Sequence, residues 1–208
     1  MKRRFVKLLT LSLISSILTG CGALARDASK KSQDAEEKLN KIKAEALTAD
    51  QETDVTFDVN IVSYDTVNGF SYELMKHNLE EKNPVLSPMS AYLALSMAGN
   101  GARGETLDEF HAMLGNNLNT IPYEIIHSLQ KSETDMTISF ANSVWVDEQL
   151  EAADTYLAAV HQYFDAEVYR KKLSTKTAME DMNIWIDAKT NGMIPSMINE
   201  TLDLPTCH

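Results

Sequence analysis

Three glycines in six residues form the pattern with the most specific chemistry in this chain. Gly99, Gly101 and Gly104 have the G-x-G-x-x-G spacing with which a tight turn places backbone amides against the pyrophosphate of a dinucleotide. Such a site needs a strand before the turn and a helix after it. The flanking residues therefore decide whether these glycines bind a phosphate or only connect two elements.

Both flanks of the glycines predict helices. Upstream, Ser87 can cap a helix with Pro88 in its first turn, and residues 91–98 are almost all apolar or small. Downstream, a Thr-x-x-Glu capping box begins at Thr106, and Gly115 ends the segment. The chain about 20 residues further on, "IPYEIIHSLQ", is helix-like, where a dinucleotide site needs a second strand ending in an acid. We interpret the glycines as a structural turn and expect no cofactor.

Other catalytic or metal-binding patterns do not occur in the sequence. It contains no G-x-S-x-G, H-E-x-x-H or C-x-x-C motif. Histidines occur singly in helix-like segments, at His77, His111, His127 and His161. Cys207 and His208 are adjacent at the chain end and would make a poor tetrahedral site. We therefore predict that the protein is not an enzyme and holds no metal.

The amino terminus has the features of a bacterial secretory leader. Four basic residues within positions 2–7 precede the uncharged run 8–18, which is too short to span a bilayer. The letters "LTGC" end at Cys21 and resemble the lipobox of bacterial lipoproteins; an ordinary signal peptide with an incidental cysteine is the alternative. We expect residues 1–20 to be a signal peptide and Cys21 to carry a lipid. The protein would then be exported and anchored to the cell membrane, facing the extracellular or periplasmic side.

The charge balance of the chain is acidic. Removal of the leader would take away four of the 19 basic residues and none of the 30 acidic ones, so the formal charge would change from −11 to −15. A negative surface repels nucleic acid, heparin and anionic headgroups. We expect neither nucleic acid nor heparin as a partner, and only the lipid would hold the protein to a membrane.

The segment after the leader is rich in charge. Residues 22–55 contain no aromatic residue and no proline, and their weak helical stripe of Leu39, Ile42, Ala46 and Leu47 offers little apolar area for docking. We predict that residues 21–58 form a solvated, charged tether.

The globular part begins near residue 59 and mixes helices with strands. Residues 137–146 alternate between two usable faces and predict a long strand, on which Asn142 is a buried amide that needs partners. The other predicted elements are a helix around 70–79, the two helices beside the glycines, a helix at 121–130, a helix capped by Asp154, a strand at 166–173, and a helix boxed by Thr177 and Glu180 and ended by Gly192. This mixture predicts the α+β class.

Taken together, these segments resemble the serpin family. "NPVLSPMSAYLALSMAGNGARGETLDEFHAML" is similar to the family's N-x-x-x-SP-x-S junction followed by its GA-x-GET turn, "ISFANSVWV" to a strand of its central sheet, and "MNIWIDAKTNGMI" to the end of the helix that crosses this sheet. The resemblance covers about residues 60–206 and identifies Gly99 to Gly104 as a helix-to-helix turn. It implies a serpin-like fold with helices packed on a mainly antiparallel sheet, of which residues 59–208 are the N-terminal part.

The resemblance also assigns structural roles. The family has a shutter, where the main sheet parts to admit a new strand, and a crossing helix that must be displaced as the sheet expands. By the resemblance, Ser87 and Ser90 would lie in the shutter, and Asn183 and Trp185 would belong to the crossing helix. The same group of shutter and structural residues would include Pro88 and Asn142. The residues alone predict only a helix cap at Ser87 and a small hydroxyl in the first helical turn at Ser90.

The function implied by the resemblance is suicide inhibition of serine, and sometimes cysteine, proteases. The protease attacks a reactive-centre loop, which then inserts into the sheet as an extra strand. In the family pattern this loop lies near the carboxyl terminus, and this chain contains no counterpart of it. The last letters "TLDLPTCH" depart from the expected strand at Cys207.

We therefore interpret the chain as a truncated or frame-shifted serpin. Residues 1–208 alone should not inhibit a protease, because the reactive-centre loop is absent. They should also not form a stable monomer, because strand 137–146 would become an unpaired sheet edge. The alternative is a non-inhibitory, surface-anchored binding lipoprotein of serpin fold. Small residues in the hinge of the reactive-centre loop would favour inhibition, and bulky or charged ones would favour the alternative.

Overall fold

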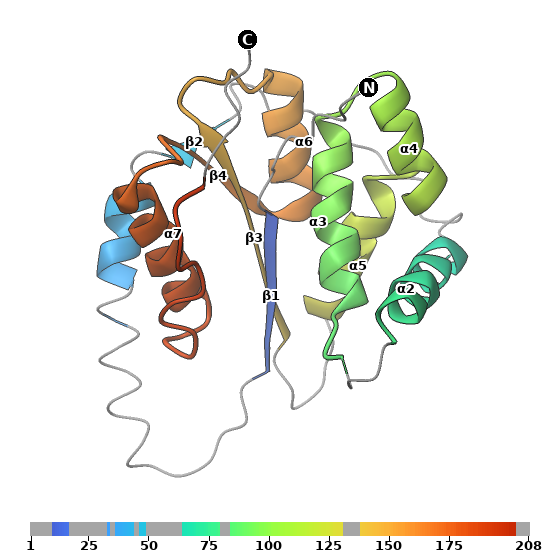
Figure 1. Ribbon diagram of the computed structural model, residues 1–208, viewed down its shortest axis with the longest axis horizontal. Coiled ribbons are helices and arrows are strands. Elements are labelled where there is room, and N and C mark those ends of the chain that lie inside the picture. The colour runs from blue at the N-terminus through green and yellow to red at the C-terminus, as the bar shows by residue number, and fades with distance from the viewer. Residues whose placement is uncertain are drawn as a thin grey trace.

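A four-stranded mixed sheet, in the order β1-β3-β4-β2, lies between two layers of helices in the described part of the chain (Figure 1). The computed structural model describes residues 10–16, 33, 36–43, 46–48, 64–79, 84–130 and 138–202. The elements are β1 (Thr10–Ser16), β2 (Ala46–Leu47), α2 (Asp65–Asn78), α3 (Pro88–Asn100), α4 (Glu105–Leu114), α5 (Thr120–Gln130), β3 (Ile138–Asp147), α6 (Asp154–Phe164), β4 (Ala166–Lys171) and α7 (Lys176–Lys189). Residues 36–43 are also helical.

Strand β3 is an interior strand of this sheet. It pairs with β1 in antiparallel fashion, with Ser12 opposite Asn142, and with β4 in parallel fashion, with Val144 opposite Val168. The short β2 pairs antiparallel with β4 and forms the far edge. Two of the three pairings are antiparallel, so the predicted mainly antiparallel sheet within an α+β fold is confirmed.

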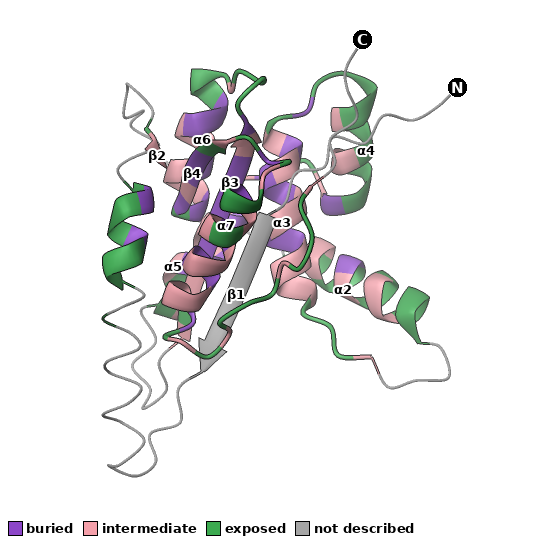
Figure 2. Cartoon of the chain, turned by 60° about the vertical axis from the view of Figure 1, so that its left-hand side comes forward, coloured by how far each residue is buried: buried purple, intermediate pink, exposed green. Residues whose placement is uncertain are grey.

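Both faces of β3 are covered, which agrees with the prediction of a strand with two usable faces. On one face Val144 packs with apolar side chains of α3, α5 and α6. On the other face Ala141 and Trp145 pack with Met182 and Ile186 of α7. Figure 2 shows that buried residues are concentrated on β3, β4 and the inner sides of the helices. Because neighbouring residues of a strand point to opposite faces, one strand contributes to both cores.

Helix α3 is buried on several sides because it lies between the sheet and an outer layer of helices. Leu93 and Met97 face the sheet, whereas Tyr92 packs with residues of α2, α4 and α5. The Tyr92 hydroxyl donates to the Leu114 carbonyl oxygen at 3.0 Å, which satisfies a free carbonyl at the end of α4. This position explains the almost continuous apolar sequence of the helix.

The start of α3 agrees with the sequence, and the start of α4 does not. The Ser87 Oγ accepts a hydrogen bond from the Ser90 amide at 3.3 Å, and Pro88 is the first helical residue, as predicted. In α4 the N-cap is Gly104, so the capping box predicted at Thr106 is wrong. The turn enters α4 through the positive φ of Gly104, and Thr106 already lies within the helix. Gly115 ends α4, as predicted.

Two later helices also begin at residues other than those predicted. The N-cap of α6 is Ala153, and Asp154 is the first helical residue. The N-cap of α7 is Thr175, whose Oγ1 accepts from the Ala178 amide at 3.2 Å, so the box predicted at Thr177 is wrong. A turn from Lys172 to Thr175 starts α7 earlier than the local pattern indicates. At the other end, Gly192 donates its amide to the Asp187 carbonyl and closes the helix, as predicted.

Part of the segment predicted to be a solvated tether docks onto the sheet. Leu39 and Ile42 are only 4% exposed and belong to the core formed by α7, β3 and β4. Ala46–Leu47 forms β2. The expectation that this segment gains little by docking is wrong for these residues, because the edge of β4 and the side of α7 together offer an apolar surface that the sequence does not reveal.

The expected open edge of β3 is covered by residues of the predicted leader. Thr10–Ser16 pairs along β3 from Ile138 to Val144, so the expectation that β3 is an edge strand is wrong for the chain that retains these residues. An apolar segment of this length can supply the missing backbone partners of a strand. Cleavage after residue 20 stays a prediction. Among the described residues, no helix has the length and apolar character needed to cross a membrane.

Candidate functional site

The three glycines lie at a helix-to-helix turn between α3 and α4. A Cβ on Gly99 would lie 2.7 Å from Leu118 Cδ1, and one on Gly101 would lie 3.3 Å from Tyr156 Cε2. Gly104 has open space around it but a φ of 57° and a ψ of −139°, which side-chain-bearing residues rarely adopt. Close packing and turn geometry therefore account for all three positions.

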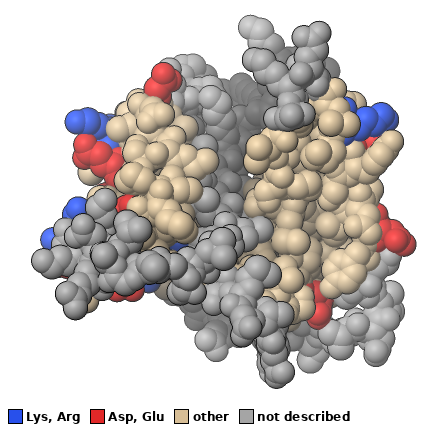
Figure 3. All heavy atoms as spheres, turned by 90° about the horizontal axis from the view of Figure 1, so that it is seen from below, with Lys and Arg blue, Asp and Glu red and all other residues tan. Residues whose placement is uncertain are grey.

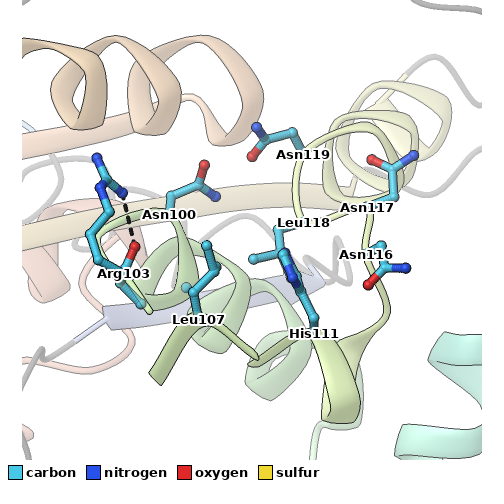
Figure 4. A pocket seen from close by; sticks show the side chains of 10 residues that line it. Asn100, Arg103, Leu107, His111, Asn116, Asn117, Leu118 and Asn119 are labelled. Atoms are coloured by element: carbon cyan, nitrogen blue, oxygen red, sulfur yellow. Dashed lines mark hydrogen bonds between the residues drawn. The ribbon is translucent and has the colours of Figure 1, made fainter. Parts of the chain in front are cut away.

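A polar cavity of about 260 Å³ lies beside this turn. Figure 4 shows its labelled side chains on the end of α3, on the turn after it, on α4 and on the loop before α5: Asn100, Arg103, Leu107, His111, Asn116, Asn117, Leu118 and Asn119. The chain enters the glycines through helix α3, which contains Gly99. A dinucleotide site needs a strand at this place. The predicted helix-to-helix connection is present. That the glycines serve only as a structural turn stays a prediction.

Replacing Gly104 by alanine tests this interpretation. We expect Gly104→Ala to lower the free energy of unfolding by about 1–3 kcal/mol, because the residue must adopt a backbone conformation that is strained for alanine. Urea unfolding of the full-length protein measures the change. Gly69→Ala is the matched control: its new Cβ meets nothing within 4 Å inside α2, and we expect a gain of about 0.5–1 kcal/mol. Equal effects of the two substitutions would contradict the assignment.

The two serines of the predicted shutter contact each other. The Ser87 and Ser90 Oγ atoms lie 2.8 Å apart, and Ser87 also caps α3. Among the described residues, no hydrogen bond joins either serine to Asn142. Met89 and Phe140 pack in the same apolar clusters, so the first turn of α3 lies near the start of β3.

Asn142 connects β3 to the end of α6. The side chain is 2% exposed, and its Nδ2 donates to the Phe164 carbonyl oxygen at 2.7 Å. This bond satisfies one of the carbonyls left free where α6 ends. The Asn142 Oδ1 has no hydrogen-bond partner within the described structure. The amide is thus half satisfied, and the predicted need for partners is met for its donor only.

Asn183 fixes the segment that follows α7. Its Oδ1 accepts from the amides of Met197 and Ile198 at 2.8 and 2.9 Å, and its Nδ2 donates to the Ile198 carbonyl oxygen at 2.8 Å. These three bonds fold the chain back along the helix. Ile194 and Ile198 pack against the core beneath α7, so Asn183 joins the helix and its following segment into one unit.

Glu167 of β4 is a contact centre that sequence reasoning missed. Its Oε2 accepts from the Tyr169 hydroxyl at 2.8 Å and from Trp185 Nε1 at 2.6 Å. Its Oε1 accepts from Lys189 Nζ at 2.9 Å and lies 3.5 Å from Lys43 Nζ. One signal for this residue was present in the sequence, an acid among the apolar residues of "AEVY". Its partners could not be predicted, because most of them come from distant parts of the chain.

The hydrogen bonds to Glu167 favour its charged form. Burial raises the pKa of Glu167, but the hydrogen bonds from Trp185, Lys189 and Tyr169 and the charge of Lys189 outweigh burial, so the pKa lies below its ordinary value of 4.5. Burial, together with the neighbouring carboxylate, raises the pKa of Tyr169. The cluster therefore consists of a carboxylate, a neutral phenol, an indole and ammonium groups.

This lowered pKa predicts acid sensitivity. The pKa of Glu167 is lower in the folded than in the unfolded chain. The carboxylate therefore stabilises the fold fully above pH 4.5, and this stabilisation is lost as the pH falls through the pKa of the folded state. We expect Glu167→Gln to flatten the fall of the urea midpoint between about pH 5 and pH 3 in the full-length protein. Glu180→Gln, at an exposed position on α7, is the control. An unchanged pH profile for Glu167→Gln would contradict the prediction.

Several predicted residues cannot be placed. Cys21, Cys207 and His208 lie outside the described residues. Within the described residues, no group of three or more His, Cys, Asp or Glu side chains is arranged to hold a metal ion.

Helices on both faces of a mixed sheet, the GA-x-GET turn after α3 and helix α7 across the strands define the class of the protein as an α+β serpin fold. A sequence model of the family described as "Serpin (serine protease inhibitor)" matches residues 65–207. The chain belongs to the serpin family.

Individual relatives agree with this assignment. The chain is 29% identical over 136 residues to Iripin-1 from Ixodes ricinus, covering 61% of this chain and 35% of that protein. It is 27% identical over 135 residues to a corticosteroid-binding globulin from Oryctolagus cuniculus, again covering 61% and 35%. The solved structure of a loop C-sheet serpin polymer is similar with a TM-score of 0.62 at 29% identity, covering 73% of this chain and 43% of that chain. The chain thus spans about a third of the length of these curated relatives.

Proposed function

We propose that this chain is the amino-terminal part of an inhibitor of serine or cysteine proteases that acts by inserting a reactive-centre loop into its sheet. The single observation that carries the proposal is the attachment of α7. This helix packs on β3 and β4 through an apolar core and is held there by a few directional bonds, notably from Trp185 to Glu167. Asn183 makes the helix and its following segment one unit. Such a unit can move as a body when the sheet accepts a strand.

The test is a protease trap assay on the full-length protein. We expect an SDS-resistant complex with at least one trypsin-like, chymotrypsin-like, subtilisin-like or papain-like protease. Residues 1–208 alone should form no such complex, because they contain no counterpart of the reactive-centre loop. Complex formation by residues 1–208, or no complex between the full-length protein and any of these proteases, would contradict the proposal.

A non-inhibitory binding protein is the second candidate. It is favoured by one observation: a corticosteroid-binding globulin matches this chain about as well as Iripin-1 does. The amino acids in the hinge of the reactive-centre loop distinguish the two functions. Alanine and threonine there permit insertion, whereas bulky or charged residues prevent it.

We further propose that the protein is exported and carries its lipid on Cys21. The basic segment, the short apolar run and the letters "LTGC" support this location. Labelling with a radioactive fatty acid in the producing bacterium should mark the wild type and leave Cys21→Ser unlabelled. Equal labelling of both proteins would contradict the lipid site.

A further inference from the structure

Residues 36–43 together with Ala46–Leu47, which we call the N-terminal strap, contact the sheet and α7 in an ordered way. The helical part turns Leu39 and Ile42 into the core, where both are 4% exposed, while Lys38 and Lys41 are exposed. In Figure 1 this unlabelled blue helix lies beside α7. Its buried side chains share one core with Met182, Trp185 and Ile186 of α7.

The second part of the strap joins the sheet. Ala46 is paired with Tyr169 and Leu47 with Val168, which makes β2 the neighbour of β4. His161 of α6 donates from Nε2 to the Leu47 carbonyl oxygen at 2.9 Å. The strap is thereby fixed both to β4 and to α6, the helix on the opposite face of the sheet.

One carboxylate connects the strap to α7. Lys43 of the strap and Lys189 of α7 both lie within ion-pair distance of the same Glu167 oxygen, at 3.5 and 2.9 Å. Glu167 also accepts the indole N–H of Trp185. A movement of α7 away from β4 would break the Lys189 and Trp185 bonds and uncover Leu39 and Ile42.

We propose that the N-terminal strap clamps α7 onto β4 and so restrains the displacement of α7. All of its residues follow Cys21, so the clamp persists if the leader is removed. The restraint on α7 stands without any assumption about function. Only its consequence, a slower expansion of the sheet and hence slower protease trapping, rests on the proposed inhibitory function.

Amide hydrogen exchange of the full-length protein tests the clamp. In Leu39→Ala/Ile42→Ala we expect peptides from α7 and β4 to exchange at least about tenfold faster, because the local opening energy of these elements falls. Peptides from α2 and α4, which lie in a separate core, should keep their rates. The matched control is Lys38→Ala/Lys41→Ala, two exposed positions on the same helix, which should leave all rates unchanged.

A milder variant covers the case in which the double substitution disturbs folding. Lys43→Ala removes an exposed side chain together with its ion pair to Glu167 and leaves Leu39 and Ile42 in place. We expect about a twofold increase in the amide exchange rate, confined to α7. Unchanged α7 exchange in Leu39→Ala/Ile42→Ala, or equal acceleration of α7, α2 and α4, would overturn the clamp. The exchange measurement uses no protease, so it tests the clamp even if the trap assay fails. Conversely, the trap assay tests the proposed inhibitory function even if the exchange rates do not change.

Discussion

Trp185→Ala is expected to lower the free energy of unfolding of the full-length protein by about 3–5 kcal/mol. The indole is 1% exposed and packs in the core between α7, β3 and β4. Truncation leaves a cavity there and removes the N–H that donates to Glu167 at 2.6 Å. The half-buried carboxylate of Glu167 then keeps its contacts to Tyr169 and the lysines.

Two variants separate the causes of this loss. Trp185→Phe retains most of the packing and removes the hydrogen bond, so we expect a loss of about 1–3 kcal/mol. Lys176→Ala, at an exposed position in the first turn of α7, should change stability by less than about 0.5 kcal/mol. Urea unfolding followed by the fluorescence of the other tryptophan, Trp145, measures all three variants. Equal losses for the alanine and phenylalanine variants would show that packing of the indole contributes little.

Residues 21–208 are expected to self-associate when produced alone. They lack β1, so the backbone donors and acceptors of β3 that pair with Thr10–Ser16 become an open edge. An unpaired strand of this length is a template for other chains. Size-exclusion chromatography with light scattering should show oligomers and aggregates at micromolar concentration instead of a single monomer peak.

A charge on the open edge should reduce this association. Ser139 is exposed on β3 and pairs with Ser15 of β1, so Ser139→Lys places a lysine on the edge, where lysine opposes pairing between chains. We expect the monomer fraction of residues 21–208 to increase several-fold. Thr106→Lys adds the same charge at an exposed position on α4 and should have no such effect. A monomeric, cooperatively melting chain 21–208 would contradict the edge prediction.

Local rules in the sequence determined the elements from α2 to α7 and their order. The alternation along 137–146 identified a strand with two usable faces, and Ser87-Pro88 identified the start of α3. Flanking helices identified the three glycines as a turn. These features depend on residues within a few positions of one another, so they can be predicted from a single sequence. The family resemblance added the shutter residues, whose functional role stays a prediction.

Contacts between distant segments were decided only by the tertiary structure. Leu39 and Ile42 look like a weak stripe in a charged segment, and their burial follows from a surface that α7 and β4 form together. Glu167 looks like a single acid in a strand, and its partners come from positions up to 124 residues before it and 22 residues after it. The N-cap of α7 likewise depends on the turn that leaves β4. A sequence fixes local periodicity and capping chemistry, whereas the free energy of a docked segment depends on apolar area that exists only after the chain has folded.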